Sequence, residues 1–258
     1  MVCPEWVAII PYAYIRQGDS EVFYNDSKYQ WWGETSKGIY RTIELAKEDG
    51  KKIMLKPQVW FVHDWIGNLP LQTESEMKVF KESYSEYILE YARLAQLMEI
   101  EMFCVGTELK SALNNHPELL NELIKEVRCV YDGSLTYAAN WDNYMNIPIW
   151  NELDVIGINA YFPLSGRKTP EVEYLIQLWK DKSSELEKLS KRFDKKIWFT
   201  EYGYLSVDHA ADKTWELESR IHELSINEVA QSNALDAFYQ TWKNSKFIVG
   251  GFLWKWFP

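Results

Sequence analysis

The 258-residue chain has little cysteine and no Gly/Ser-rich or Pro-rich segment, and each shortage excludes a class of protein. Its three cysteines, Cys3, Cys104 and Cys129, are odd in number and unevenly spaced. Such spacing predicts neither a disulfide framework nor a CxxC metal site. Because no linker divides the sequence, we expect one compact domain over residues 1–258, a length common for single α/β barrels.

Basic residues and long apolar runs are also scarce. The chain has 28 Lys and Arg against 38 Asp and Glu, and its net charge is -10. Nucleic-acid binding needs clustered basic residues, whereas these are dispersed. No apolar run approaches the roughly 18 residues of a membrane span. The first residues, MVCPEWVAIIPYAYIR, lack the basic and apolar regions of a signal peptide. We therefore expect no nucleic-acid partner and no membrane span, and the compartment stays open.

Metal-binding spacings are missing as well. The four histidines of the chain show no HxH or HExxH pattern, and such patterns are typical of zinc sites. We therefore predict that the protein uses no metal and no other cofactor.

Aromatic residues, in contrast, are abundant. The sequence contains 13 Trp, 16 Tyr and 11 Phe, which is more tryptophan than a core of this size requires. Since sugar rings stack on aromatic side chains while their hydroxyls need polar partners, some of these residues are expected to face a ligand.

Short β-forming runs alternate with longer amphipathic stretches along the whole chain, a pattern typical of repeated βα units with a parallel sheet. The seven expected strands cover residues 6–15, 52–60, 101–109, 135–141, 154–162, 196–204 and 247–256. The expected helices cover residues 36–49, 74–98, 117–131, 170–192 and 226–244, the second opened by a capping box of Thr73 and Glu76.

This alternation predicts the α/β class and a (β/α)8 TIM-type barrel, because no Gly-rich phosphate loop of a doubly wound fold follows the first strand. A closed barrel needs eight strands, and seven are found. We therefore expect that this chain lacks the first βα unit and the last helix. The alternative is a seven-stranded or irregular barrel.

Two of the expected strands end in a glutamate: Glu108 in EMFCVGTELKS and Glu201 in KKIWFTEYGYLS. Barrel enzymes carry their sites at the C-terminal ends of the strands. Hydrolysis of a glycosidic bond with retention needs a carboxylic acid and a carboxylate about 5 to 5.5 Å apart, which two such glutamates can supply. The alternative is that both are rim carboxylates in salt bridges.

Five ordered stretches resemble glycoside hydrolase family 113, the β-mannanase-like branch of the retaining clan A of barrel glycosidases. They are FCVGTELKS, TYAANWDNY, LDVIGINAYFPL, WFTEYGY and GGFLWKWFP. The resemblance implies that Glu108 is the acid/base and Glu201 the nucleophile. In the clan these residues end the fourth and seventh strands; here they end the third and sixth, so their spacing of three strands is kept.

The resemblance also sets expectations for the two glutamates and their neighbours. The acid must hold its proton near neutral pH, so we expect Glu108 to be less solvated, or nearer a like charge, than Glu201. Thr107 stands where the clan more often has Asn, so the sugar 2-hydroxyl needs another donor. Asn159 stands where many relatives have Asp. Tyr161 is expected to donate a hydrogen bond to the nucleophile, and the alternative is that it packs on the barrel rim.

Eight further residues at or near strand ends are the predicted lining of a sugar cleft. They are Lys56, Gln58, Trp60, Asn140, Trp141, Asn159, Tyr161 and Trp254. For Trp254 the resemblance implies a place under the sugar at the cleavage point. Trp31, Trp32 and Glu34 are outer-subsite candidates. The alternative for each tryptophan is packing, and for Lys56 it is a salt bridge.

Three functions remain open. The leading hypothesis is a retaining glycoside hydrolase acting on β-linked hexose chains, with β-mannan or glucomannan favoured by the resemblance. The second is a catalytically impaired carbohydrate-binding barrel protein. The third is an unrelated proton-transfer enzyme, because one barrel fold hosts many chemistries.

Overall fold

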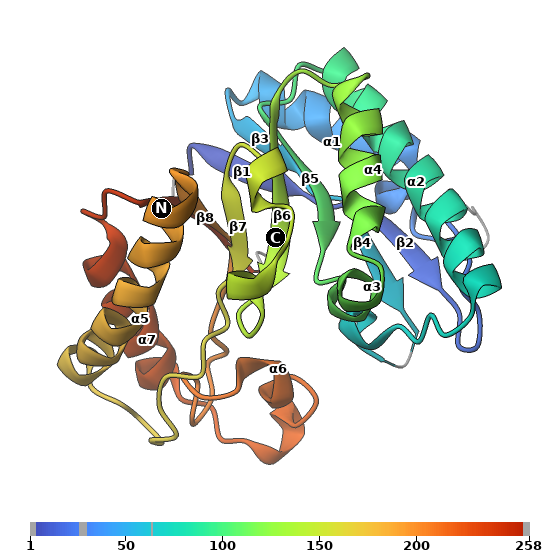
Figure 1. The fold of residues 1–258 in the computed structure, drawn as a ribbon. Helices are drawn as coiled ribbons and strands as arrows, with labels where there is room; N and C mark the ends of the chain where they lie inside the picture. Colours follow the sequence, from blue (N-terminus) through green and yellow to red (C-terminus); the bar gives the residue numbers. More distant parts are fainter. Residues whose placement is uncertain (1–3, 26–29, 63, 255–258) are drawn as a thin grey trace. The chain divides into compact units, whose positions relative to one another are not determined.

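The computed structural model describes residues 4–25, 30–62 and 64–254 and divides into two compact units. The first contains the residues up to Ala139 together with Asn146–Val155. The second contains Asn140–Met145 and the residues from Ile156 onward. Figure 1 shows that strands and helices alternate along the chain in both units.

The first unit is built on parallel strands that follow one another in the order β1-β3-β5-β6. A separate parallel pair, β2-β4, extends it. The strands are β1 (Trp6–Ile9), β2 (Tyr12–Ile15), β3 (Lys52–Leu55), β4 (Gln58–Phe61), β5 (Met102–Thr107) and β6 (Ser134–Asn140). The α-helices are α1 (Ser36–Glu48), α2 (Glu74–Leu97), α3 (Lys110–Asn115) and α4 (Glu118–Arg128).

Two of the predicted strands are each split in two. The stretch 6–15 divides into β1 and β2 around Pro11, and the stretch 52–60 divides into β3 and β4 around Pro57. Proline has no backbone N–H to give to a ladder, so a strand is interrupted where it occurs. Backbone pairing between the two stretches nevertheless continues across the breaks. Lys56 N donates to Ile9 O and Gln58 N donates to Pro11 O, each at 2.9 Å.

The second unit repeats the pattern with three parallel strands in the order β7-β8-β9. Its strands are β7 (Ile156–Asn159), β8 (Ile197–Tyr202) and β9 (Ile248–Leu253). Its α-helices are α5 (Val172–Phe193), α6 (Thr214–Leu217) and α7 (Glu228–Trp242). Helices α5 and α7 lie side by side (Figure 1).

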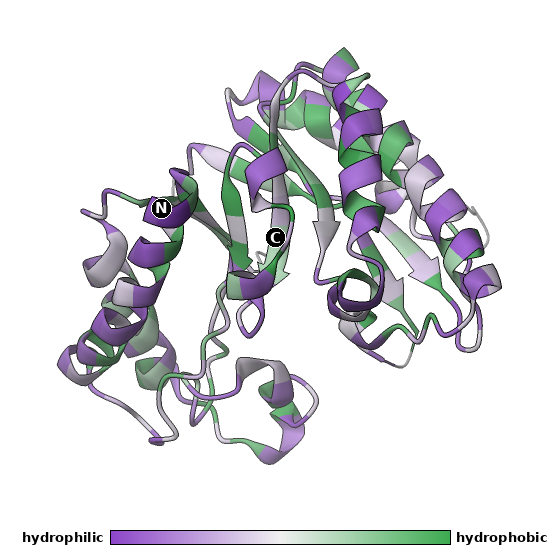
Figure 2. Cartoon of the chain, viewed as in Figure 1, coloured by the Kyte–Doolittle hydropathy of each residue, from purple (hydrophilic) through white to green (hydrophobic). Residues whose placement is uncertain are grey.

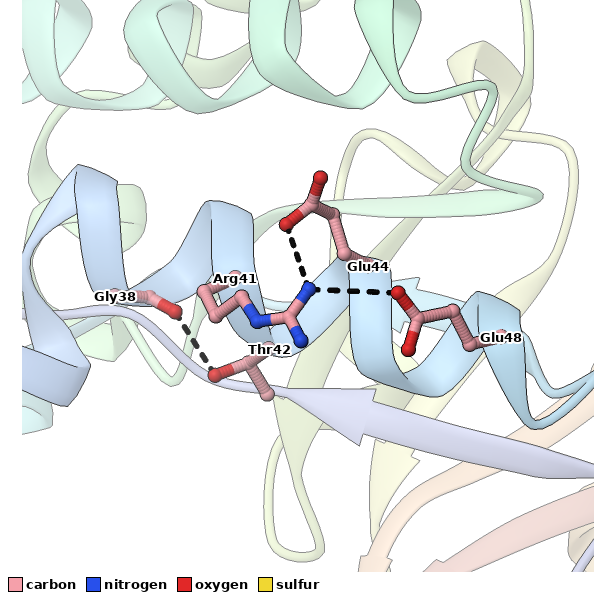
Figure 3. Close-up of polar contacts among 5 residues, drawn as sticks. All are labelled: Gly38, Arg41, Thr42, Glu44 and Glu48. Carbon is pink, nitrogen blue, oxygen red and sulfur yellow. Dashed lines mark hydrogen bonds and ion pairs between the residues drawn. The ribbon is translucent and has the colours of Figure 1, made fainter.

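Local sequence signals explain where the helices begin and which face they expose. The predicted capping box of Thr73 and Glu76 is confirmed at the start of α2. On the exposed side of α1, Arg41 forms ion pairs with Glu44 and Glu48 (Figure 3). Exposed pairs of this kind contribute at most about 1 kcal/mol each, so burial of the other face must supply most of the stability of this helix.

The buried faces of the helices pack on the strands and satisfy their carbonyl groups. In the first unit, α2 buries Tyr84 and Tyr87, whose hydroxyls donate to Val105 O at 3.0 Å and to Pro11 O at 2.8 Å. In the second unit, Trp179 of α5 is fully buried and contacts the ring of Phe199 on β8. Figure 2 shows that hydrophobic residues predominate in the strands while the helices carry both kinds.

The parallel pairing and the strand–helix alternation confirm the predicted α/β class and TIM-type barrel architecture. All seven predicted strands and all five predicted helices are present, within a few residues of their expected ends, although two strands are split and residues 255–256 of the last lie outside the described residues. The short helices α3 and α6 were not predicted. The expected lack of a first βα unit and a last helix stays a prediction. Among the described residues, no helix is long and apolar enough to cross a membrane.

Candidate active site

Glu108 follows directly after β5, where the backbone leaves the strand in an unusual conformation. Its φ is 53°, in the left-handed region that few residues other than glycine adopt. The turn is held because Glu108 N donates to Ala138 O on β6 at 2.9 Å and Leu109 N donates to the Tyr137 hydroxyl at 2.8 Å. Non-glycine residues in such conformations cluster at functional sites, so Glu108 is one of several described residues whose backbone marks a candidate position.

The side chain of Glu108 is held by an aromatic donor. The indole Nε1–H of Trp65 donates to Glu108 Oε2. Trp65 immediately precedes the short helix η2 (Ile66–Asn68) in the segment between β4 and α2. Trp65 was not predicted from the sequence, although it belongs to the segment that follows a strand end, where barrel sites occur.

The residues beneath Glu108 form a densely packed support. All of β5 is buried, and a side chain at Gly106 would meet the Tyr84 hydroxyl oxygen at 2.9 Å. Tyr137, on β6, is fully buried, and burial is the main cause that raises the pKa of its hydroxyl far above the ordinary value. It therefore remains a neutral partner for the Leu109 amide. Thr107 is also buried, so it is not exposed to a sugar in this structure.

The candidates on β3 and β4 differ in exposure. Lys56 is completely buried, and its Nζ donates to Gln58 Oε1 at 3.2 Å. Gln58 is half-buried, whereas the Trp60 side chain is 57 % exposed. The structure thus brings Lys56 and Gln58 together. Only Gln58 and Trp60 have surface to offer to a sugar in this structure.

In the second unit, Glu201 lies within β8 and is only 5 % exposed. The predicted hydrogen bond from Tyr161 is confirmed: its hydroxyl donates to Glu201 Oε2 at 2.8 Å. Asn159 pairs with Glu201 in the strand register and accepts a hydrogen bond from the Thr200 hydroxyl at 2.8 Å. These residues form one connected group at the ends of β7 and β8.

Trp254 approaches the end of β8 through its backbone. Its amide donates to Tyr202 O at 2.7 Å, and its carbonyl lies so close to Gly203 that a Cβ there would overlap it. Glycine is needed where another backbone comes this close. The half-buried Trp254 is therefore held beside Tyr202 and Gly203, the two residues that follow Glu201.

Asn140 ends β6 and Trp141 follows it, at the start of the second unit's segment Asn140–Met145. Asn140 Nδ2 donates to Asp142 Oδ1 at 3.0 Å. The Trp141 ring stacks on Trp215 of α6 with centroids 5.0 Å apart. Trp215 was not found from the sequence, because the stack depends on the conformation of the segment between β8 and α7.

One expectation about the two glutamates is wrong as regards solvation. Glu108 was expected to be the less solvated, but it is half-buried while Glu201 is buried. The physical reason is local: Glu201 belongs to a central strand, whereas Glu108 lies past the end of its strand in the turn to α3. The other half of the expectation, that Glu108 lies nearer a like charge than Glu201, stays a prediction.

The outer candidates are accessible. Trp31 and Trp32 are 74 % and 59 % exposed, and Glu34 accepts a hydrogen bond from the Tyr14 hydroxyl at 2.5 Å. Their role in binding sugar stays a prediction. Within the described part of the chain, no group of three or more His, Cys, Asp or Glu residues is arranged to hold a metal ion.

Comparisons with known proteins bear on the whole chain. The family described as Glycoside Hydrolase Family 113 matches residues 2–258. No curated protein matches the chain. A solved GH113 beta-mannanase from Alicyclobacillus acidocaldarius, in complex with ManMIm, is 25 % identical with a TM-score of 0.85. The match covers 98 % of this chain and 78 % of that one.

Two further solved structures are similar. One is a GH113 beta-1,4-mannanase with a TM-score of 0.80 and 26 % identity, covering 98 % of this chain and 77 % of that one. The other is one of two fungal beta-1,4-galactanases, 13 % identical with a TM-score of 0.59, covering 95 % and 76 %. The last likeness shows the fold alone.

Proposed function

Because this chain belongs to glycoside hydrolase family 113, we propose that Glu108 is the acid/base and Glu201 the nucleophile of its retaining hydrolysis. One observation carries the assignment: each glutamate stands at the end of a parallel strand and accepts a hydrogen bond from one aromatic residue, Trp65 or Tyr161. The active sites of TIM-type barrels are built from these strand ends.

The proposed reaction is a double displacement. In the first step Glu201 attacks the anomeric carbon, the glycosidic C–O bond breaks, and Glu108 gives its proton to the leaving oxygen. In the second step Glu108 takes a proton from water, the water oxygen bonds to the anomeric carbon, and the bond to Glu201 breaks. Tyr161 donates to Glu201 Oε2 and so orients the carboxylate for the attack.

We propose a β-1,4-linked mannan or glucomannan as the substrate. Two similar solved structures are mannanases by their descriptions, and one was determined with the ligand ManMIm. Exposed aromatic rings suit the apolar faces of a sugar chain. The proposed binding residues are Lys56, Gln58, Trp60, Asn140, Trp141, Asn159, Tyr161 and Trp254. Lys56, being buried, would act through Gln58.

We also propose that both units belong to one glycosidase barrel domain over residues 1–258. The support is that the family match extends over residues 2–258 without a break at either unit boundary.

Release of reducing sugar from β-1,4-mannan tests the proposal. The unaltered chain should release sugar, and Glu201→Gln should abolish the release because the amide of glutamine does not form the covalent intermediate. Glu187→Gln is the matched control, since Glu187 lies on α5 and pairs with the exposed Lys191. It should behave like the unaltered chain. Binding of mannan without release by the unaltered chain would instead favour a catalytically impaired binding protein.

A further inference from the structure

We propose that Trp65 is a positioning residue that holds Oε2 of Glu108, so that the other carboxyl oxygen, Oε1, carries the catalytic proton. The inference rests on the proposed role of Glu108 as the acid/base. It adds a residue that the strand-end pattern did not identify, and it assigns different tasks to the two oxygens of one carboxyl group.

The chemistry of the indole ring carries the assignment. Its Nε1–H can donate a hydrogen bond and cannot accept one. Oε2 of Glu108, which receives this bond, must therefore act as an acceptor in both protonation states. When Glu108 is a carboxylic acid, its carbonyl oxygen is a better acceptor than its hydroxyl oxygen, so this bond favours the proton on Oε1. As the glycosidic bond breaks, that proton moves to the leaving oxygen and Glu108 becomes a carboxylate.

The backbone around Trp65 fixes the direction of the indole ring. Asp64 Oδ1 accepts hydrogen bonds from Trp65 N at 2.6 Å and from Asn68 Nδ2 at 3.0 Å. Asn68 N also donates to Trp65 O at 2.9 Å. Gly67 lies against the ring, and a Cβ at Gly67 would overlap the six-membered ring of Trp65. Glycine at this position therefore allows the ring to lie where it reaches Glu108.

Lys110, the first residue of α3, lies over the indole ring of Trp65. Lys110 Nζ is 6.0 Å from the centre of the Trp65 ring, at the outer limit of a cation–π interaction. Lys110 N donates to Glu108 O at 2.7 Å. The turn after β5 thus contacts Trp65 through both the carboxyl group of Glu108 and the side chain of Lys110.

The kinetic consequence depends on the leaving group. Protonation is needed to expel a sugar alcohol, but an activated aryl oxide leaves without it. A variant that only misdirects the acid should therefore lose rate on mannan and keep its rate on an activated aryl β-mannoside. A merely structural defect would lower both rates together.

The test compares kcat/KM for β-1,4-mannan and for a dinitrophenyl β-mannoside, because this parameter reports the steps up to formation of the covalent intermediate. Trp65→Phe keeps an aromatic ring and removes the N–H. We expect a loss of about 10- to 100-fold on mannan, the effect of one hydrogen bond to a charged group, and less than about threefold on the activated substrate. Tyr40→Phe, at an exposed tyrosine of α1, should change neither value.

Gly67→Ala provides a second and independent test, since Gly67 has no positive φ and alanine is acceptable to its backbone. Displacing the ring should give the same selective loss on mannan, so this variant decides the question if Trp65→Phe does not fold. Equal losses on both substrates, or no loss on mannan, would overturn the inference.

Glu108→Ala, measured alongside, separates the two proposals. If it loses mannan selectively while the Trp65 and Gly67 variants do not, only the role of Trp65 is wrong. If Glu108→Ala shows no dependence on the leaving group, the assignment of Glu108 as the acid/base is itself wrong.

Discussion

At the scale of single residues, the two glutamates differ in the contacts that orient them. Glu201 is buried in β8 and receives the Tyr161 hydroxyl, whereas Glu108 lies in a left-handed turn and receives the Trp65 indole. A nucleophile is needed for every substrate, while a proton donor is needed only for poor leaving groups. The two hydrogen-bond donors should therefore be distinguishable by kinetics.

Tyr161→Phe should lower kcat/KM for mannan and for an activated aryl β-mannoside by the same factor, about 10- to 100-fold, because Glu201 loses the contact that orients it for the attack. Parallel rate measurements on the two substrates check this. Tyr174→Phe, on α5, is the control and should leave both rates unchanged. A loss confined to mannan would contradict the assignment of Glu201 as the nucleophile.

Part of the site could be predicted from residues alone. Asn159 and Tyr161 were expected at or near a strand end, and the structure shows both in contact with β8. Trp65 and Trp215 could not be predicted in the same way, because each acts from a segment between a strand and a helix. The periodicity of regular elements carries no information about the direction of a side chain in such a segment.

At the scale of elements, the close approach of β8 and β9 depends on a missing side chain. A Cβ at Gly203 would overlap the carbonyl oxygen of Trp254, a backbone atom that cannot turn aside. Gly203→Ala should therefore lower the free energy of unfolding by about 1 to 3 kcal/mol, as overpacking does, and should also lower activity. Thermal or urea denaturation measures the change.

Gly166→Ala is the matched control for this prediction. Gly166 has no positive φ, and the nearest atom to an added Cβ is Asp212 Oδ2 at 3.9 Å. Its stability should equal that of the unaltered chain or exceed it slightly, because alanine restricts the unfolded chain. Equal destabilisation by both substitutions would show that the approach of Trp254 is not what requires glycine.

The lengths of the elements explain why most of them could be predicted and some could not. Helices α2 and α5 are long and amphipathic, so their period was clear. The breaks at Pro11 and Pro57 follow from proline chemistry and could have been expected, whereas the six-residue α3 and the four-residue α6 are too short to show a period. Helices of this length depend on tertiary contacts rather than on their own propensity.

At the scale of the whole molecule, similarity along the entire chain identifies a class of reaction that single residues leave open. From composition alone we could only expect that no nucleic acid binds. Two glutamates at strand ends are also compatible with salt bridges on the rim. Five ordered stretches resembled one family of retaining glycosidases, and that family matches residues 2–258. Sequence order rather than any single motif therefore identified the class of reaction.

The most direct test of the two proposed roles is the anomeric configuration of the mannosyl azide formed from an activated aryl β-mannoside and azide. With Glu108→Ala, Glu201 first forms the covalent intermediate and azide then replaces it, which predicts a β-mannosyl azide. With Glu201→Ala, azide takes the place of the nucleophile, which predicts an α-mannosyl azide. Nuclear magnetic resonance distinguishes the two products. The opposite pair of configurations, or no azide product from either variant, would contradict the roles proposed for Glu108 and Glu201.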